Sequence, residues 1–385
     1  MLALRLARGT HPLVLLRRLL VAAASGGVGF LLLCTLGYAL GHPEQSAGSV
    51  RRLLWCLPPL ATTVYFAVAV ARTDPSTNAP RTGLSAVGLG PARLAALAAV
   101  STALSCTLGS ALALLFFLHL RGDLSGLPFD GAGAELLAAG RPLPVAGALT
   151  LLCVVPVAAA TACALALRPR AAKRPDAEPA GPVSPTGLPW GVALVAAGLA
   201  VETYVSRGRP GASLALPGRL DVAPAGVLAG WALTAFGLAL AGPGLTYFSG
   251  RVLQAVRPGA ARLLAGRVLM DEARRLGRPL GVLCAVVSAA IAAAALYDGG
   301  AAADPFGPVA GLGAALVLAC TVATLMMAAL EMRQSRAPTT EALVGLGAPS
   351  QTLRAAAALR AAAVLAVFAP VTVGLATLAA SPLTA

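Results

Sequence analysis

Long apolar stretches, separated by short polar segments, run through the whole chain. The apolar stretches cover residues of about 19–40, 53–72, 94–118, 145–167, 188–205, 225–249, 279–297, 308–331 and 355–380. Because an α-helix rises 1.5 Å per residue, about 20 residues cross a hydrocarbon core of roughly 30 Å. The pattern therefore predicts an all-α polytopic membrane protein with about nine transmembrane helices.

The composition agrees with this prediction and excludes a soluble globular protein. Of the 385 residues, 58% are hydrophobic and 11% are charged, whereas soluble domains carry about a quarter charged residues. The net charge of +14 would suggest nucleic acid binding in a soluble chain. Here the basic residues favour alternate polar segments by about three to one, which predicts a cytoplasmic N-terminus and an outer C-terminus. We expect no nucleic acid partner.

An internal repeat is predicted from a matching tetrapeptide. Val87–Gly90 recurs as Val344–Gly347, 257 residues further along the chain. The same shift carries spans one, two and three onto spans seven, eight and nine, together with three arginines that precede span one or span seven. We predict a first membrane unit of four helices (1–168), a flexible linker with a central helix pair (169–250), and a second unit (251–385). The second unit has three helices and lacks a counterpart of span four.

Signatures of catalysis and metal binding are not found in this sequence. Lys173, the only lysine, follows Ala172, so the Gly-Lys-Ser/Thr core of a phosphate-binding loop is missing. The three histidines have no metal-ligand spacing, and the seven cysteines lie inside apolar stretches. We therefore expect no enzyme activity of the chain by itself, and no metal or cofactor bound to it.

Two ionisable residues lie inside predicted spans, where such residues often mark ion or proton pathways. Glu202 is about three residues from the predicted outer end of span five, so that its side chain is expected to reach the headgroups. Arg360 is about a turn and a half inside span nine and can extend to the cytoplasmic surface. For both residues the interfacial interpretation is favoured over a coupling role.

The two predicted cytoplasmic loops that contain the repeated tetrapeptide are the main candidate sites. Each loop begins with Ala-Pro and offers a short amphipathic helix that is broken at Gly-x-Gly, before the next span enters the membrane. A short helix set against a long one is a suitable lever for a partner. The alternative is a plain helical hairpin with a glycine C-cap. The candidate residues are Arg81, Gly88, Leu89, Gly90 and Arg93 in the first loop, and Glu341, Gly345, Leu346, Gly347 and Arg354 in the second.

These paired loops resemble the FtsX-like permease family of ABC transporters, over spans one to four and seven to nine. Glu341, Leu343, Leu346–Ala348 and Leu353–Arg354 match the family's loop pattern, and Leu84, Leu89–Gly90 and Arg93 match it more loosely. The resemblance implies a permease subunit that couples ATP hydrolysis to export or to transmembrane mechanical signalling. It also implies a separate ATPase subunit that binds ATP and Mg²⁺ and contacts Arg81, Arg93, Glu341 and Arg354.

The chain departs from that family in two respects. A tenth helix is missing, and only about ten residues follow span one or span seven, where many members carry a large extracellular domain. An ion-coupled secondary transporter and a non-transporting membrane scaffold stay open as alternatives. The expected surroundings are the lipid bilayer of a bacterial plasma membrane, and a second permease chain or a homodimer is a further expected partner.

Overall fold

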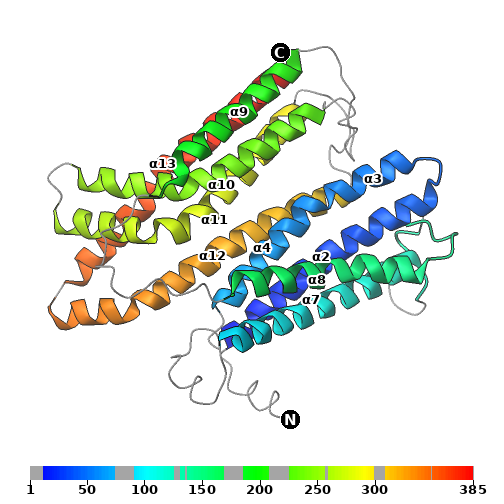
Figure 1. The fold of residues 1–385 in the computed structure, drawn as a ribbon, viewed down its shortest axis with the longest axis horizontal. Coiled ribbons are helices and arrows are strands. Elements are labelled where there is room, and N and C mark those ends of the chain that lie inside the picture. The colour runs from blue at the N-terminus through cyan, green and yellow to red at the C-terminus, as the bar shows by residue number, and fades with distance from the viewer. Residues whose placement is uncertain are drawn as a thin grey trace, which may run out of the picture. The chain divides into compact units, whose positions relative to one another are not determined.

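The computed structural model is helical throughout the residues that it describes. These residues are 12–73, 91–124, 131–134, 137–168, 185–207, 225–255, 259–298, 308–347 and 349–384. Their helices are α2 (Pro12–Gly41), α3 (Ser46–Trp55), α4 (Leu57–Thr73), α7 (Pro91–Arg121), α8 (Val145–Ala166), α9 (Gly187–Arg207), α10 (Ala225–Gln254), α11 (Ala260–Asp298), α12 (Pro308–Gly345) and α13 (Ser350–Thr384) (Figure 1).

Within the described part of the chain, nine helical segments are long and apolar enough to cross a membrane. Helices α3 and α4 together form one of the nine segments, and each of the other eight contains a single helix. The predicted fold class is confirmed, because every predicted span is helical and no strand occurs among the described residues. The protein is a multi-pass helical membrane protein.

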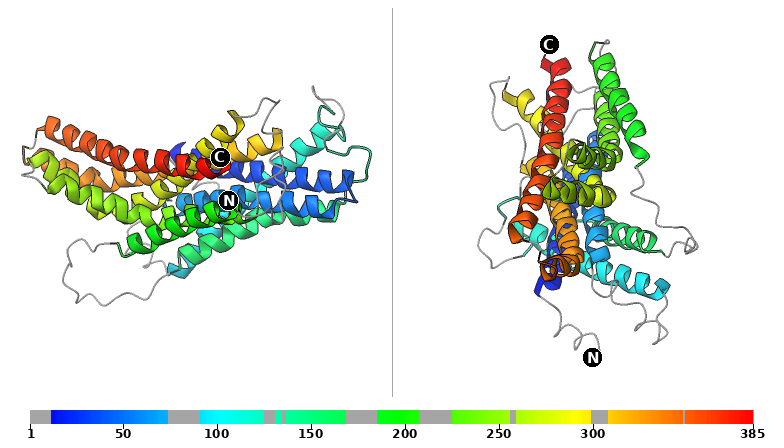
Figure 2. Two further views of the ribbon diagram at one scale, coloured as in Figure 1. Left: turned by 90° about the horizontal axis from the view of Figure 1, so that it is seen from above. Right: turned by 90° about the vertical axis from the view of Figure 1, so that its left-hand side faces the viewer.

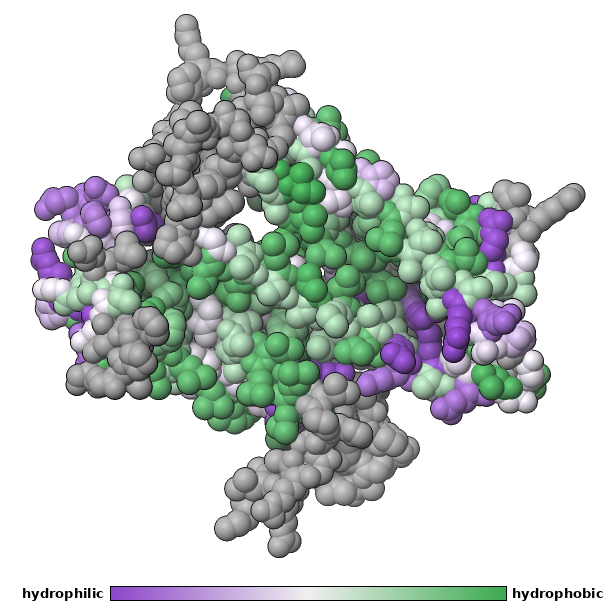
Figure 3. Space-filling model, turned by 180° about the vertical axis from the view of Figure 1, so that it is seen from behind, coloured by the Kyte–Doolittle hydropathy of each residue, from purple (hydrophilic) through white to green (hydrophobic). Residues whose placement is uncertain are grey.

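The outer surface of the helices is as apolar as a bilayer requires. On α7, the side chains of Leu97, Leu104, Leu108, Leu112 and Leu115 are each more than half exposed. Their spacing of three, four or seven residues places them on one face of the helix. In Figure 3, hydrophobic residues cover much of the visible surface outside the grey atoms. Such a surface would be a large aggregation liability in water but suits contact with lipid.

The chain forms two compact units, and in the first unit small residues let α2 and α7 approach closely. Among the described residues, this unit contains those between 12 and 168 and those from 308 to 320. A methyl group at Gly26 would meet the Gly109 carbonyl oxygen at 3.0 Å. Ser25 Oγ donates a hydrogen bond to the Cys106 carbonyl oxygen (2.9 Å), and Ser110 Oγ donates one to Leu152 O of α8 (3.2 Å). Small residues and hydroxyl groups are the usual contacts between membrane helices.

The second unit contains α9, α10, α11, α13 and the rest of α12. Helix α10 packs against both α9 and α11, and α11 packs against α13, so that these helices run alongside one another in Figures 1 and 2. A buried cluster of Leu238, Cys284, Ala285, Phe368 and Leu375 joins α10, α11 and α13. Cys284 Sγ and Thr372 Oγ1 lie 3.0 Å apart in the α11–α13 contact.

Some of the helices related by the predicted repeat pack in a similar way inside each unit. Helix α2 packs on α7 in the first unit, and its counterpart α11 packs on α13 in the second. Within the first unit, Thr63 Oγ1 of α4 lies 3.5 Å from Cys320 Sγ of α12. These two residues are counterparts under the shift of 257 residues, and a residue that contacts its own counterpart is typical of two-fold symmetry. The contacts of α2 with α7 and of α11 with α13 are alike, whereas α2 packs on α4 and α11 does not pack closely on α12. The repeat stays a prediction.

Two helices extend well beyond the predicted spans. Helix α11 begins at Ala260, so the basic amphipathic stretch before span seven is the first half of the same helix, which contains Pro279. Helix α12 continues past residue 331 to Gly345, with Pro338 inside it. The predicted separate short helix after span eight is therefore wrong. Strong helix formers continue the helix, and a proline removes one hydrogen bond and bends the helix without ending it.

Candidate functional site

The α12–α13 hairpin brings the predicted residues of the second loop together. Helix α12 ends at Gly345 and α13 begins at Ser350. Gly347 has a φ of +89°, and the backbone N–H groups of Leu346 and Gly347 donate hydrogen bonds to the carbonyl oxygens of Ala342 (3.0 Å) and Val344 (2.9 Å). This is the glycine cap that the alternative interpretation of the loop expected.

The tip of this hairpin combines apolar and charged side chains that are exposed. Leu346 is 85% exposed and Val344 is 53% exposed. Glu341 and Arg354 flank them, also exposed, and neither forms an ion pair with another described residue. An apolar centre with charged neighbours is a suitable surface for a protein partner. This exposed surface lies at the end of a helix of 38 residues.

Most of the first predicted loop cannot be compared with the second. Arg81, Gly88, Leu89 and Gly90 lie outside the described residues. Arg93 lies in the first turn of α7 and is exposed. Pro91 is the first residue of this helix, a position where the missing N–H costs nothing and the fixed φ suits the helix.

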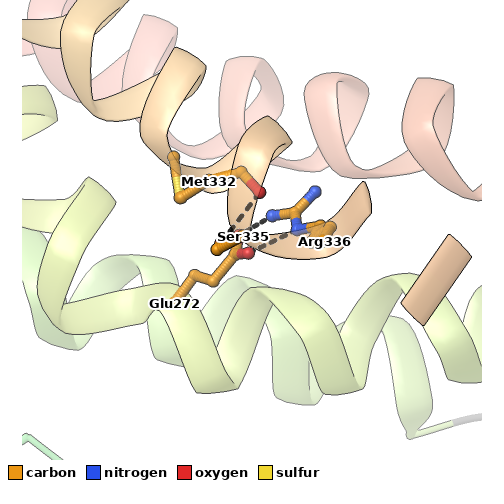
Figure 4. Close-up of polar contacts among 4 residues, drawn as sticks. All are labelled: Glu272, Met332, Ser335 and Arg336. Atoms are coloured by element: carbon orange, nitrogen blue, oxygen red, sulfur yellow. Dashed lines mark hydrogen bonds and ion pairs between the residues drawn. The ribbon is translucent and has the colours of Figure 1, made fainter. Parts of the chain in front are cut away.

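An ion pair between α11 and α12 stabilises the part of α12 that leads to the hairpin (Figure 4). Arg336 Nε donates a hydrogen bond to Glu272 Oε1, and Arg336 Nη2 pairs with Glu272 Oε2. The two side chains are 28% and 14% exposed. Beside them Met332 is buried, and Ser335 Oγ donates a hydrogen bond to its carbonyl oxygen (3.0 Å). A bidentate pair fixes both distance and orientation.

Arg360 adds a third charge from α13 to this pair. Its side chain is half-buried, and its positive charge is near enough to act on Arg336. Glu272 of α11 and Arg336 of α12 make the contact itself, whereas Arg360 of α13 carries a like charge that repels Arg336 and forms no ion pair with any described residue. Sequence reasoning identified Arg360 as an isolated residue and missed Glu272. The available signal was the pair of acidic residues, Asp271 and Glu272, within the strongly basic segment 262–278.

Glu202 is buried, contrary to the expectation that it reaches the headgroups. Its side chain is 2% exposed, and neither carboxylate oxygen has a hydrogen-bond partner among the described residues. It lies between α9 and α10, where a methyl group at Gly230 would meet the Glu202 Cγ at 2.5 Å. Because Gly230 has no side chain, it leaves the space that Glu202 occupies. Tertiary packing, rather than position along the span, decided where this carboxyl lies.

One cavity among the described residues is too small for a substrate. This cavity of about 20 Å³ in the first unit is lined by Arg18, Ser101, Thr102 and Ser105, among others. That volume suits about one water molecule. Throughout the described ranges, no group of three or more histidine, cysteine or acidic side chains is arranged to hold a metal ion.

Comparison of the chain with protein-family models, with curated proteins and with solved structures finds no match. The resemblance to FtsX-like permeases therefore rests on the loop residues and on the repeat. The fold is that of a multi-pass helical membrane protein.

Proposed function

We propose that the protein is the membrane-spanning subunit of an ABC transporter, similar to FtsX-like permeases. A separate ATPase subunit, which binds ATP and Mg²⁺, docks on the α12–α13 hairpin and on the loop before α7. Its conformational cycle moves the helices to drive export or a mechanical signal across the membrane. The observation that carries this proposal is the hairpin. Its exposed Leu346 lies between Glu341 and Arg354, neither of which pairs with another described residue.

The ion pair between α11 and α12 supports a mechanical role for the hairpin. A push on the tip reaches α11 only if the end of α12 is held against it. The bidentate pair of Glu272 and Arg336 supplies that connection. In this proposal the pair transmits motion of the hairpin to the long basic helix α11, and a rigid helix carries it into the membrane.

The proposal is tested by co-purification in mild detergent with candidate ATPases from the same genome. The chain is compared with a variant that carries Glu341→Lys and Arg354→Glu. The matched control carries Glu44→Lys and Arg141→Glu, two exposed residues on polar segments of the first unit that are predicted to face the opposite side. We expect stoichiometric capture by the native chain and by the control, and at least a tenfold loss in the hairpin variant.

Failure to capture any ATPase, with the helical content intact by circular dichroism, would contradict the proposal. The buried Glu202 then favours the second candidate function, an ion-coupled secondary transporter. Uptake into vesicles that is driven by a proton or sodium gradient without ATP would identify that function. If neither ATPase capture nor gradient-driven uptake is found, the membrane scaffold is the remaining candidate.

A further inference from the structure

In the contact between α9 and α10, two buried polar groups have no hydrogen-bond partner among the described residues. Besides Glu202, the Oγ1 atom of Thr234 is buried and makes no hydrogen bond to another described residue. Gly230 and Thr234 lie one turn apart on α10, as Gly198 and Glu202 do on α9. A methyl group at Gly198 would meet Thr234 Oγ1 and the Gly230 carbonyl oxygen. The carboxyl and the hydroxyl therefore lie on neighbouring turns inside the same helix contact.

Among the described side chains, none carries a charge that neutralises an ionised Glu202. The helices that pack on α9 are α10 and α13. On α10, Tyr247 and Arg251 are 17 or more residues from Gly230, which is about 25 Å along a helix. On α13, the turn of Phe368 lies near α9, because Phe368 belongs to the buried cluster that Leu199 of α9 contacts. Arg354 and Arg360 lie before that turn, in an earlier part of α13. Glu202 makes no ion pair with any described residue.

An isolated buried carboxylate is far more costly than a buried neutral carboxyl group. A metal cation would need several oxygen ligands and the space to hold them. The site offers one carboxyl and one hydroxyl between helices whose glycines leave no room for a methyl group. A proton needs neither additional ligands nor volume.

We propose that Glu202 is a proton-binding site in the contact between α9 and α10. The carboxylate takes up one proton and becomes a neutral carboxylic acid while the two helices are packed. It releases that proton to water when they separate. Glu202 lies five residues before the end of α9 at Arg207, about 7.5 Å along the helix axis. A proton therefore has only a short distance to travel between the carboxyl group and the end of the helix. This inference does not rest on the ATPase proposal.

The site is tested by infrared spectroscopy of the purified full-length chain in lipid membranes. Exposed carboxyl groups are ionised at neutral pH because their ordinary pKa is about 4. We expect the carbonyl band of a protonated carboxylic acid at neutral pH in the native chain. The band should be absent from Glu202→Gln and present in Glu44→Gln, which removes an exposed carboxyl instead. Alkaline pH should remove the band.

Two results would overturn the proposal: a native chain without the band at neutral pH, and a band that persists in Glu202→Gln. Loss of the band on adding sodium ions at constant pH would also overturn it, in favour of a cation site. If Glu202→Gln does not fold, Glu202→Asp is tested in its place. Aspartate keeps the carboxyl group on a side chain that is one methylene group shorter, so the carboxyl lies closer to α9. A shifted band in that variant supports the assignment, and an unshifted band contradicts it.

Thermal unfolding supplies a second readout. Burial between the packed helices favours the neutral carboxyl group, whereas contact with water favours the ionised carboxylate. Ionisation of Glu202 therefore favours the state in which α9 and α10 are separated. The stability of the native chain should fall as the pH rises from acidic to alkaline, whereas Glu202→Gln should lose this part of the dependence. Equal pH profiles for the two chains would contradict the proposal.

Discussion

Glycine has one structural role in the contacts between α9, α10 and α11 and a different role in the α12–α13 hairpin. At Gly191, Gly198, Gly242 and Gly277 a methyl group would collide with the backbone of the neighbouring helix. At Gly345 and Gly347 it would meet nothing within 4 Å, although Gly347 needs its positive φ. In the first region glycine permits close approach, and in the second it ends a helix. Glycines in the helix contacts should therefore not tolerate a side chain, whereas the hairpin has space for one.

The largest effect is expected where two helix backbones touch. In Gly242→Val the new side chain would meet the Gly277 carbonyl oxygen and lie 3.2 Å from the Gly281 Cα before any further branching. Because backbone cannot move aside as a side chain can, we expect a loss of about 3 kcal/mol or more, measured by thermal unfolding in detergent. The matched control is Gly374→Val in the interior of α13, where nothing lies within 4 Å. Equal losses in the two variants would contradict the close-approach role.

An intermediate effect is expected at the connection between the two regions. The pair of Glu272 and Arg336 is partly exposed, so its contribution lies between those of surface and buried ion pairs. A double-mutant cycle with Glu272→Ala and Arg336→Ala should give a coupling energy of about 1–2 kcal/mol. The measurement is chemical unfolding of the single variants and of the double variant. A coupling near zero would show that the two side chains do not hold the helices together.

The smallest effect is expected in the hairpin itself. Gly347→Ala places a side chain at a φ of +89° and should cost about 1 kcal/mol. Gly345→Ala, two residues earlier at an open position, should stay within about 0.5 kcal/mol of the native chain. Thermal unfolding compares the two. If Gly345→Ala proves the more harmful variant, the role assigned to the cap is wrong.

The same contrast explains which parts of the candidate site were predictable. Gly345-Leu346-Gly347 was found from sequence because a glycine cap is local chemistry between neighbouring residues. The continuation of α12 past Pro338 was missed because a single proline bends a helix but does not end it. Glu272 and Arg336 are 64 residues apart in the chain, and no local pattern links them. The first loop, with Arg81 and Gly88–Gly90, stays a prediction.

The sequence by itself determined the fold class and the approximate positions of nine apolar spans, and it offered the glycine cap after α12 as one of two interpretations of that loop. These follow from apolar run length and from local backbone geometry, which depend on neighbouring residues. The tertiary structure decided that Glu202 is buried against Gly230 and that Glu272 meets Arg336. Which face of a membrane helix is buried is set by how closely two backbones can approach. That depends on small residues in both helices at once, and hydropathy along one helix does not specify the partner.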